Sequence, residues 1–521
     1  MKTALVLLAL LTAFLAPARA ATLNELNGPL LNKGQWEFNA LSNINYSANK
    51  DRQTAVDGTG SKADSNATQV TLSPGASYGL TEKLTLLVQE SFIVPYTIAY
   101  KHYLLPGTPD AYYKSSILGR NMLSSSLTWR PSDPWQFLFS GSRSYIGSSR
   151  ETGDLTGSGA VNTQDQQGYD SRLAAQATWL STPKAGPITA NNRADLDGLL
   201  NPLLDQGQAK AALGLNYFAG YAHANYELLR GPRSDLQSFR TTSGELSFSP
   251  SFSYGLLGNL QAQAVAELIL PNATSSLSRS RYVVTNAGVS SYRSSTNKDR
   301  TLAGYYPSLS LTHRLNRQLQ WYVSGNYSYS KSGQRGVNVN ETTGVISPDS
   351  RVSGYESAAV GAGADWISAP RKEGRPLTAD LDGLKKPLLE RGQFWAAASY
   401  STSKQRYWTA GAPTEPGDTS SVYYSELSYG VRDALQAFAS VQIVPGYSQR
   451  SATFKSINPA AKTYGAGLTW RPRQTFQASA ETSISPGVRK SVNYDGNGAV
   501  TSTARTDSTS CATSLNATWL W

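Results

Sequence analysis

The sequence predicts an all-β fold, a transmembrane antiparallel β-barrel of about 18 strands. Three observations support this prediction: an alternating C-terminal segment, an N-terminal export signal with no apolar helix after it, and a unit of six strands that occurs three times. A barrel strand needs alternation because every second side chain faces lipid while its neighbours face water.

The C-terminal segment alternates most clearly. In residues 515–521 the odd positions are Leu, Ala, Trp and Trp, and the even positions include Asn516 and Thr518. A strand that ends on aromatic residues is typical of the signal recognised by the bacterial barrel-assembly machinery, and we assign this signal to Trp519 and Trp521. The alternative is the edge strand of a soluble sheet, which leaves the other two observations unexplained.

The N-terminus predicts a signal peptide over residues 1–20. Lys2 gives the positive start, an apolar stretch follows, and Ala18-Arg19-Ala20 is a small-x-small cleavage site that makes Ala21 the mature N-terminus. Beyond residue 20 there is no run of about 18 apolar residues, so no transmembrane helix is expected. We therefore expect the bacterial outer membrane as the location, with its lipid and lipopolysaccharide as partners.

The composition fits a barrel better than a soluble enzyme domain. The chain has 29 Tyr, 11 Trp and 44 Gly but one Cys, so no internal disulfide can form. The formal charge of +11 is compatible with a polyanion partner, with lipopolysaccharide phosphates or with a charged pore. No clustered basic run favours nucleic acid, so no nucleic-acid partner is expected.

One unit recurs three times. Its first landmark is an element of Leu, Leu, Pro, Leu, Leu, Gly and Gln without gaps, whose prolines are Pro29, Pro202 and Pro387. The later landmarks are Ser-Tyr-Gly at 77–79, 253–255 and 428–430, Leu-Thr at 127–128, 311–312 and 468–469, and a strand that ends in Trp at 179, 366 and 519. We predict barrel repeats at 21–183, 184–370 and 371–521, which together form one closed barrel.

We predict six strands in each unit. In the first unit, period-2 alternation marks residues 36–46, 70–80, 84–94, 123–129, 135–145 and 173–179. The turns at 81–83 and 130–133 are short, whereas the stretches after Tyr46, Pro95 and Ile146 are long and rich in Gly, Ser, Asn and Asp. Outer-membrane barrels have short periplasmic turns and long external loops, so the proline-containing elements should be periplasmic.

Two groups of wall residues are candidates for function. Aromatic rings near the periplasmic strand ends are expected to form an interfacial belt. These residues are Tyr78, Tyr254, Tyr429, Trp129, Trp470, Trp179, Trp366 and Trp519. Glu267 and Gln442 lie on the polar side of their strands and are candidate pore-lining residues. Glu90 has the apolar parity, so it would line the pore only if a bulge turned it inward.

The proline-containing elements suggest a structure at the pore mouth. Their leucines recur at three- and four-residue steps, which is the spacing of one helix face. Because proline sits inside this pattern, we expect a short helix that starts at the proline. Three such helices would pack on the inner rim and narrow the opening. The alternative is a plain linker tucked against the barrel end.

No catalytic or metal centre is predicted. The three histidines, His102, His223 and His313, fall into no Ser/His/acid arrangement, and there is no Cys/His metal spacing. The glycine-rich stretches lack the Lys-Ser/Thr of a phosphate-binding loop. We therefore expect no enzyme activity, no metal and no cofactor.

The run Leu31-Asn32-Lys33-Gly34-Gln35-Trp36-Glu37-Phe38, followed by Ser77-Tyr78-Gly79-Leu80-Thr81-Glu82-Lys83-Leu84, resembles bacterial outer-membrane transporter barrels of the phenol meta-pathway type. Functional-amyloid secretion channels look similar. The resemblance covers about the first half of each unit, and here the unit is triplicated. It implies passage across the outer membrane without naming a cargo.

Three functions follow as expectations. The first is a porin-like channel for passive passage of a solute. The second is a secretion conduit for a polymer or an amyloid-like fibre subunit, gated by the proline-containing elements. The third is a structural or adhesive surface barrel.

Overall fold

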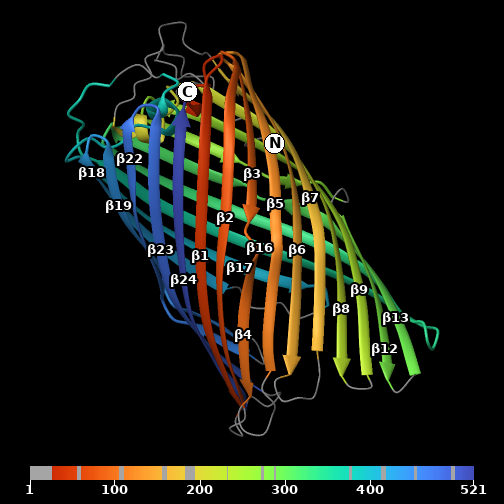
Figure 1. Ribbon diagram of the computed structural model, residues 1–521. Helices are drawn as coiled ribbons and strands as arrows, with labels where there is room; N and C mark the ends of the chain where they lie inside the picture. The colour runs from red at the N-terminus through yellow and green to blue at the C-terminus, as the bar shows by residue number, and fades with distance from the viewer. Residues whose placement is uncertain are drawn as a thin grey trace.

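The computed structural model describes residues 26–55, 60–104, 111–154, 161–181, 194–230, 233–271, 275–286, 289–374, 378–411, 418–450, 454–494 and 499–521. The predicted signal peptide lies outside these residues. The chain forms one antiparallel sheet that closes on itself as an 18-stranded barrel (Figure 1), as the alternation predicted. No helix among the described residues is long and apolar enough to cross a membrane.

The wall consists of 24 strand segments. They are β1 (Trp36–Ala55), β2 (Gly60–Thr81), β3 (Leu84–Ile93), β4 (Tyr96–Leu104), β5 (Ala111–Ser132), β6 (Trp135–Asp154), β7 (Val161–Leu180), β8 (Ala209–Arg230), β9 (Arg233–Leu257), β10 (Leu260–Val265), β11 (Leu268–Ile269), β12 (Ser275–Asn286), β13 (Val289–Tyr305), β14 (Ser308–Asn316), β15 (Leu319–Asn340), β16 (Val345–Ile367), β17 (Phe394–Thr409), β18 (Asp418–Arg432), β19 (Leu435–Val444), β20 (Tyr447–Arg450), β21 (Phe454–Asn458), β22 (Ala461–Arg473), β23 (Phe476–Tyr494) and β24 (Val500–Leu520).

Several wall strands are interrupted, which reconciles the 24 segments with 18 strands. The strand β2, for example, pairs with β3 near one end and with β4 near the other, so β3 and β4 are two pieces of one wall strand. The break between them coincides with Pro95, which has no N–H to donate to a ladder.

The barrel closes between its first and last strands. β1 and β24 pair antiparallel from Glu37 opposite Leu520 to Ala55 opposite Ser502. The backbones of Trp36 and Trp521 then exchange two further hydrogen bonds, of 3.0 and 2.8 Å. Closure leaves no free edge, which is the condition for a sheet in hydrocarbon.

The two ends of the barrel differ. At one end, which we call the short-turn end, two-residue turns join β2 to β3, β5 to β6, β9 to β10, β14 to β15, β18 to β19 and β22 to β23. At the other end the hairpins are much longer than predicted. The stretches after Tyr46 and Ile146 were expected to be loops, but they continue as strand to Ala55 and Asp154. The prediction failed because the hydrogen-bonded strand pairing continues beyond the residues in which apolar and polar side chains alternate.

The side that each residue faces follows from the register, because directly opposed residues share a side of the sheet. One side carries the exposed apolar residues, such as Trp36, Phe38 and Ile44 on β1. The alternate residues, such as Glu37, contact segments of the chain that lie inside the barrel. The apolar side is therefore the outer, lipid-facing wall, and the lumen is lined mainly by Ser, Thr, Asn, Gln and Gly.

Two short helices lie inside the short-turn end: α3 (Leu196–Leu200) and α4 (Leu381–Lys385). Figure 1 shows them within the upper mouth of the barrel, near the C-terminus. Each begins after a capping aspartate, Asp195 or Asp380, whose carboxylate accepts the N–H of the glycine three residues on, at 3.0 Å.

The helices do not start at Pro202 and Pro387 as predicted; they end before them. A proline disfavours helical geometry in the residue before it, so a helix that reaches this sequence stops there. The aspartate caps fix the start of each helix.

Candidate functional site

Three segments form a ring along the inner wall at the short-turn end. They are residues 26–35, 194–208 and 378–393, which we call the first, second and third belt segments, and together the inner belt. Each contains one of the three recurrent prolines. Their contacts with one another and with the wall follow one scheme.

Leucines connect the belt segments in a cycle. A leucine near the tail of each segment, Leu31, Leu204 or Leu389, is almost completely buried. Each packs in a cluster with the head of another belt segment and with the last residues of a wall strand. The clusters are Leu204 with Leu26 and Leu180; Leu31 with Leu381, Leu384 and Leu520; and Leu389 with Leu196, Leu199, Leu200, Ile367 and Trp395. Burial of one leucine contributes about 1.5–3 kcal/mol.

Glutamine amides connect the same partners. Gln35, at the tail of the first segment, donates to the carbonyl of Ala379 at the head of the third, at 2.7 Å. Gln393, at the tail of the third, donates to the carbonyl of Ala194 at the head of the second, at 2.5 Å. The ring therefore runs head to tail, and its order is the same as in the leucine clusters.

A close backbone crossing anchors each tail to the wall. The Gly430 N–H donates to the Gln393 carbonyl at 2.9 Å, and the Gly430 carbonyl accepts from the Gly392 N–H at 2.7 Å. A Cβ on Gly430 would lie 1.9 Å from the carbonyl oxygen of Glu390. The same crossing occurs at Gly79 and Gly255. The glycine of each Ser-Tyr-Gly landmark is therefore required because belt backbone passes directly over it.

A buried arginine anchors each head. Arg471 donates through Nε to Oε1 of Gln477, at 2.9 Å, and through Nη1 to the carbonyl of Lys386, at 2.8 Å, and it forms an ion pair with Asp382. The equivalent contacts are those of Arg314 with Gln320, Asn201 and Asp197, and of Arg130 with Gln136 and Gly28. The arginine comes from one wall strand and the glutamine from the next, so each clamp ties the belt across a turn.

The residue before each proline has a left-handed backbone. Gly28, Asn201 and Lys386 have φ values of 79°, 72° and 78°. In this conformation their carbonyls point toward the arginines. Glycine adopts it freely, whereas other residues are strained by roughly 1–3 kcal/mol. Burial also lowers the pKa of the Lys386 amine below its ordinary value.

Replacing Lys386 with Gly should therefore stabilise the barrel. We expect a gain of about 1 kcal/mol in the free energy of unfolding, since the relief of strain exceeds the extra chain entropy of glycine. Because the pKa of Lys386 is lowered in the fold, its charge costs stability below that pKa and the cost disappears as the pH rises through it. The gain should thus shrink in alkaline buffer. Urea unfolding at two pH values measures this, with Gly28→Lys as the opposite control.

Each junction of the ring has its own chemistry. One residue near the head of each belt segment is matched with the second residue of the strand that follows another belt segment. Lys385 forms an ion pair with Glu37 at 2.7 Å, Asn27 accepts a hydrogen bond from Lys210 at 2.9 Å, and Leu200 and Trp395 pack against the same buried cluster. If two belt segments changed places, a charged group would meet a neutral or apolar partner and the contact would be lost. These three pairs therefore favour one order of segments.

Most of the aromatic residues that were predicted to form an interfacial belt lie on the outer wall near the short-turn end. Trp129, Trp366, Trp470 and Trp519 are each 40% or more exposed. Rings also contact one another across strands in a tilted arrangement, as for Phe394 with Tyr429 at 4.6 Å between centroids and Trp36 with Tyr78 at 4.4 Å. The interfacial role of these residues stays a prediction.

The register places Gln442 on the lumen side, opposite Tyr424 and Thr463. Glu267 lies between β10 and β11, and its carboxylate accepts a hydrogen bond from the lumen-side Ser247 at 3.1 Å. Glu90 is different. The pairing of β3 with β5 is continuous through Glu90 opposite Leu123, so there is no bulge, and Glu90 stays on the outer side with Val88. The expectation that Glu90 lines the pore is corrected here.

Sequence reasoning missed the three arginines, and it assigned no role to the tail glutamines, although they end the recurrent proline-containing element. Arg130, Arg314 and Arg471 each directly follow the Leu-Thr landmark and one aromatic residue. Each also stands six residues before the glutamine that it binds. A recurrent charge at a strand end was therefore a usable signal.

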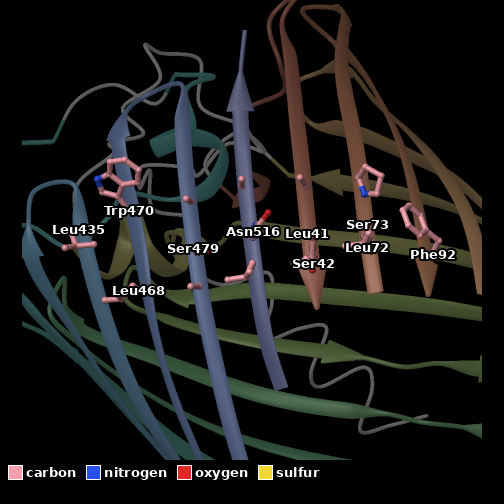
Figure 2. A pocket seen from close by; sticks show the side chains of 16 residues that line it. Leu41, Ser42, Leu72, Ser73, Phe92, Leu435, Leu468, Trp470, Ser479 and Asn516 are labelled. Atoms are coloured by element: carbon pink, nitrogen blue, oxygen red, sulfur yellow. The ribbon is translucent and has the colours of Figure 1, made fainter. Parts of the chain in front are cut away.

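The outer wall has an apolar groove at the seam between β24 and β1, with a volume of about 650 Å³. Figure 2 shows Leu435, Leu468 and Trp470 on one side of it and Leu72 and Phe92 on the other. Small residues such as Ala40 and Ala517 also line the groove. Because the groove lies on the apolar side, it belongs to the lipid-facing surface and not to the pore.

No protein-family model and no curated protein sequence matches the chain. Among solved structures, a FadL homologue of Pseudomonas aeruginosa is similar over 96% of this chain and 94% of its own, with 11% identity and a TM-score of 0.32. The toluene transporter TodX of P. putida is similar over 95% and 93%, with 8% identity and a TM-score of 0.29. The ferric citrate transporter FecA is similar over 93% and 79%, with 10% identity and a TM-score of 0.36. Such likeness extends to the barrel fold alone.

Proposed function

We propose that this protein is an outer-membrane channel for passive passage of a small solute, with the inner belt at its periplasmic mouth. The main observation behind this proposal is that a closed 18-stranded wall, polar on its inner side, holds the inner belt through hydrogen bonds. Barrels with 16–18 strands are wide enough to leave an aqueous channel. The belt follows the wall, so it narrows the mouth from its rim.

The outer apolar side and the short turns support the same orientation. Outer-membrane barrels place their short turns in the periplasm, which puts the inner belt there and the long hairpins outside. We propose outer-membrane lipid and lipopolysaccharide as the surroundings and the barrel-assembly machinery as the partner in folding.

Conductance in a planar lipid bilayer tests the function. Purified protein should give steady single-channel currents in KCl. Absence of current in barrels shown to be folded would contradict the channel and favour a structural role. Current that appears only after the belt is disrupted would favour a gated secretion conduit.

A second measurement tests whether the belt narrows the mouth. Leu26, Leu384 and Leu199 are half-buried belt leucines, and each packs against a different one of the three clusters. Replacing all three with Ser should loosen the ring and raise the single-channel conductance, while the barrel still migrates as a folded, heat-modifiable species. The matched control is Leu315→Ser, an exposed leucine of β14 outside the belt. Unchanged conductance in a folded triple variant would show that the inner belt connects parts of the wall without narrowing the mouth.

A further inference from the structure

A recess of about 720 Å³ lies on the lumen side of the wall over β3, β5, β6, β7, β8 and β9. Its lining combines charged, aromatic and amide groups with serine hydroxyls. Its lining residues include Arg172, Asn216, Phe218, Glu245, Ser247 and Glu267. The volume is within the range of small-molecule sites, which is roughly 300–1,000 Å³.

Opposite charges flank an aromatic ring in this recess. Arg172 is opposite Phe218 on the next strand, and Phe218 is opposite Glu245 on the strand after that. The Arg172 guanidinium carbon is 5.4 Å from the centre of the Phe218 ring. Neighbouring strands lie about 4.8 Å apart, so the backbones that carry the cation and the carboxylate are separated by roughly 10 Å.

These charges do not neutralise one another. Among the ion pairs found within the described residues, none includes Arg172, Glu245 or Glu267. Phe218 stands between Arg172 and Glu245, and the hydroxyl of Ser247 holds the Glu267 carboxylate. By contrast, the lumen carboxylate of Glu37 is paired with Lys385. The recess thus presents one cationic and two anionic groups to the lumen.

We propose that this recess binds short zwitterionic peptides, with the C-terminal carboxylate on Arg172 and the N-terminal ammonium on Glu245 and Glu267. A guanidinium can bind a carboxylate through two parallel hydrogen bonds. An extended peptide of three residues spans at most about 10 Å, which matches the spacing of β7 and β9, the strands that carry Arg172 and Glu245. The serine hydroxyls of the recess and the Asn216 amide face the peptide backbone between its two charged ends. This inference rests on the proposed channel function and names its solute class.

Binding to the detergent-solubilised barrel tests the site without reference to transport. The probes are triglycine, a zwitterion, and N-acetyltriglycinamide, which has a similar shape but no charge. Calorimetry should show that triglycine binds at least about tenfold more tightly than the capped peptide, because each charge contributes a charge-assisted hydrogen bond. Equal binding of the two probes, or no binding of triglycine, would overturn the proposal.

Arg172→Gln and Glu245→Gln should each weaken triglycine binding about tenfold and leave binding of the capped peptide unchanged. The matched control is Glu481→Gln, which removes an exposed carboxylate of β23 that has the same parity as the lumen-side Gln477 but lies outside the recess. Heat-modifiable migration confirms that each variant is folded. If folded variants bind triglycine like the wild type, the assignment of the recess is wrong.

Single-channel current in KCl, recorded with the same preparation, separates the two proposals. Open channels that bind triglycine, with current interruptions that disappear in Arg172→Gln, support both. Open channels without binding overturn the site and leave the channel. Triglycine binding without current in KCl overturns the channel function and the role of the recess in transport.

Discussion

Removal of Trp519 to Trp521 should leave an unfolded chain in the cell envelope and no barrel in the outer membrane. These residues complete β24, which pairs with β23 on one side and β1 on the other. Leu520 is buried against Leu31 and Leu381, and the backbone of Trp521 bonds to Trp36. Their loss opens the seam at the end where the belt is attached and exposes two strand edges.

The measurement is heat-modifiable migration of protein from outer-membrane fractions. Trp179→Ala and Trp366→Ala are the matched controls, because these tryptophans end internal strands at the equivalent place. They should lower stability without preventing assembly. A truncated protein that still appears as folded barrel would refute both the terminal assembly signal and the need for the seam.

The wall was predictable because lipid imposes a simple rule. Alternation in residues such as Trp36, Phe38 and Ile44 reports which side faces hydrocarbon, and the rule acts on each strand separately. The short turns and the placement of Glu267 and Gln442 on the lumen side followed from the same rule. The hairpin length did not, since beyond the membrane both sides of a strand meet water and the pattern no longer differs from that of a loop.

The inner belt was predictable only in outline. Recurrent leucines located the three segments, but the pairing of Leu31 with Leu381, or of Gln35 with Ala379, depends on closure of the ring across more than 340 residues. No local pattern records such a contact. The triplicated origin of the chain and the proposed repeat boundaries remain predictions, although the three segments make equivalent contacts.

The helix starts were misplaced for a local reason. Proline is favoured in the first turn of a helix, and that preference suggested a start at Pro202 and Pro387. The aspartate caps at Asp195 and Asp380 and the left-handed residue before each proline decide otherwise. Glu90 shows a similar limit, because a lone charge with lipid parity suggested a bulge that the continuous ladder does not contain.

Replacement of Arg471 with Ala should destabilise the barrel by about 3–5 kcal/mol, because it removes the cation that balances the Asp382 carboxylate, whose side chain is only 16% exposed. Arg471 binds Gln477, the Lys386 carbonyl and Asp382 at once, and its side chain is only 3% exposed. The third belt segment should then detach from the turn between β22 and β23. Urea unfolding followed by tryptophan fluorescence measures the loss, and the single-channel conductance should rise as the mouth widens.

The exposed Arg432, the last residue of β18, supplies the matched control: Arg432→Ala should change the free energy of unfolding by less than about 0.5 kcal/mol. The double variant Arg471→Met with Asp382→Asn removes both charges and should recover part of the stability, since the uncompensated negative charge of Asp382 causes most of the loss. Full stability in Arg471→Ala would show that the leucine clusters and the glycine crossings hold the belt unaided. A destabilised Arg471→Ala with unchanged conductance would show that the belt stiffens the rim without setting the width of the pore.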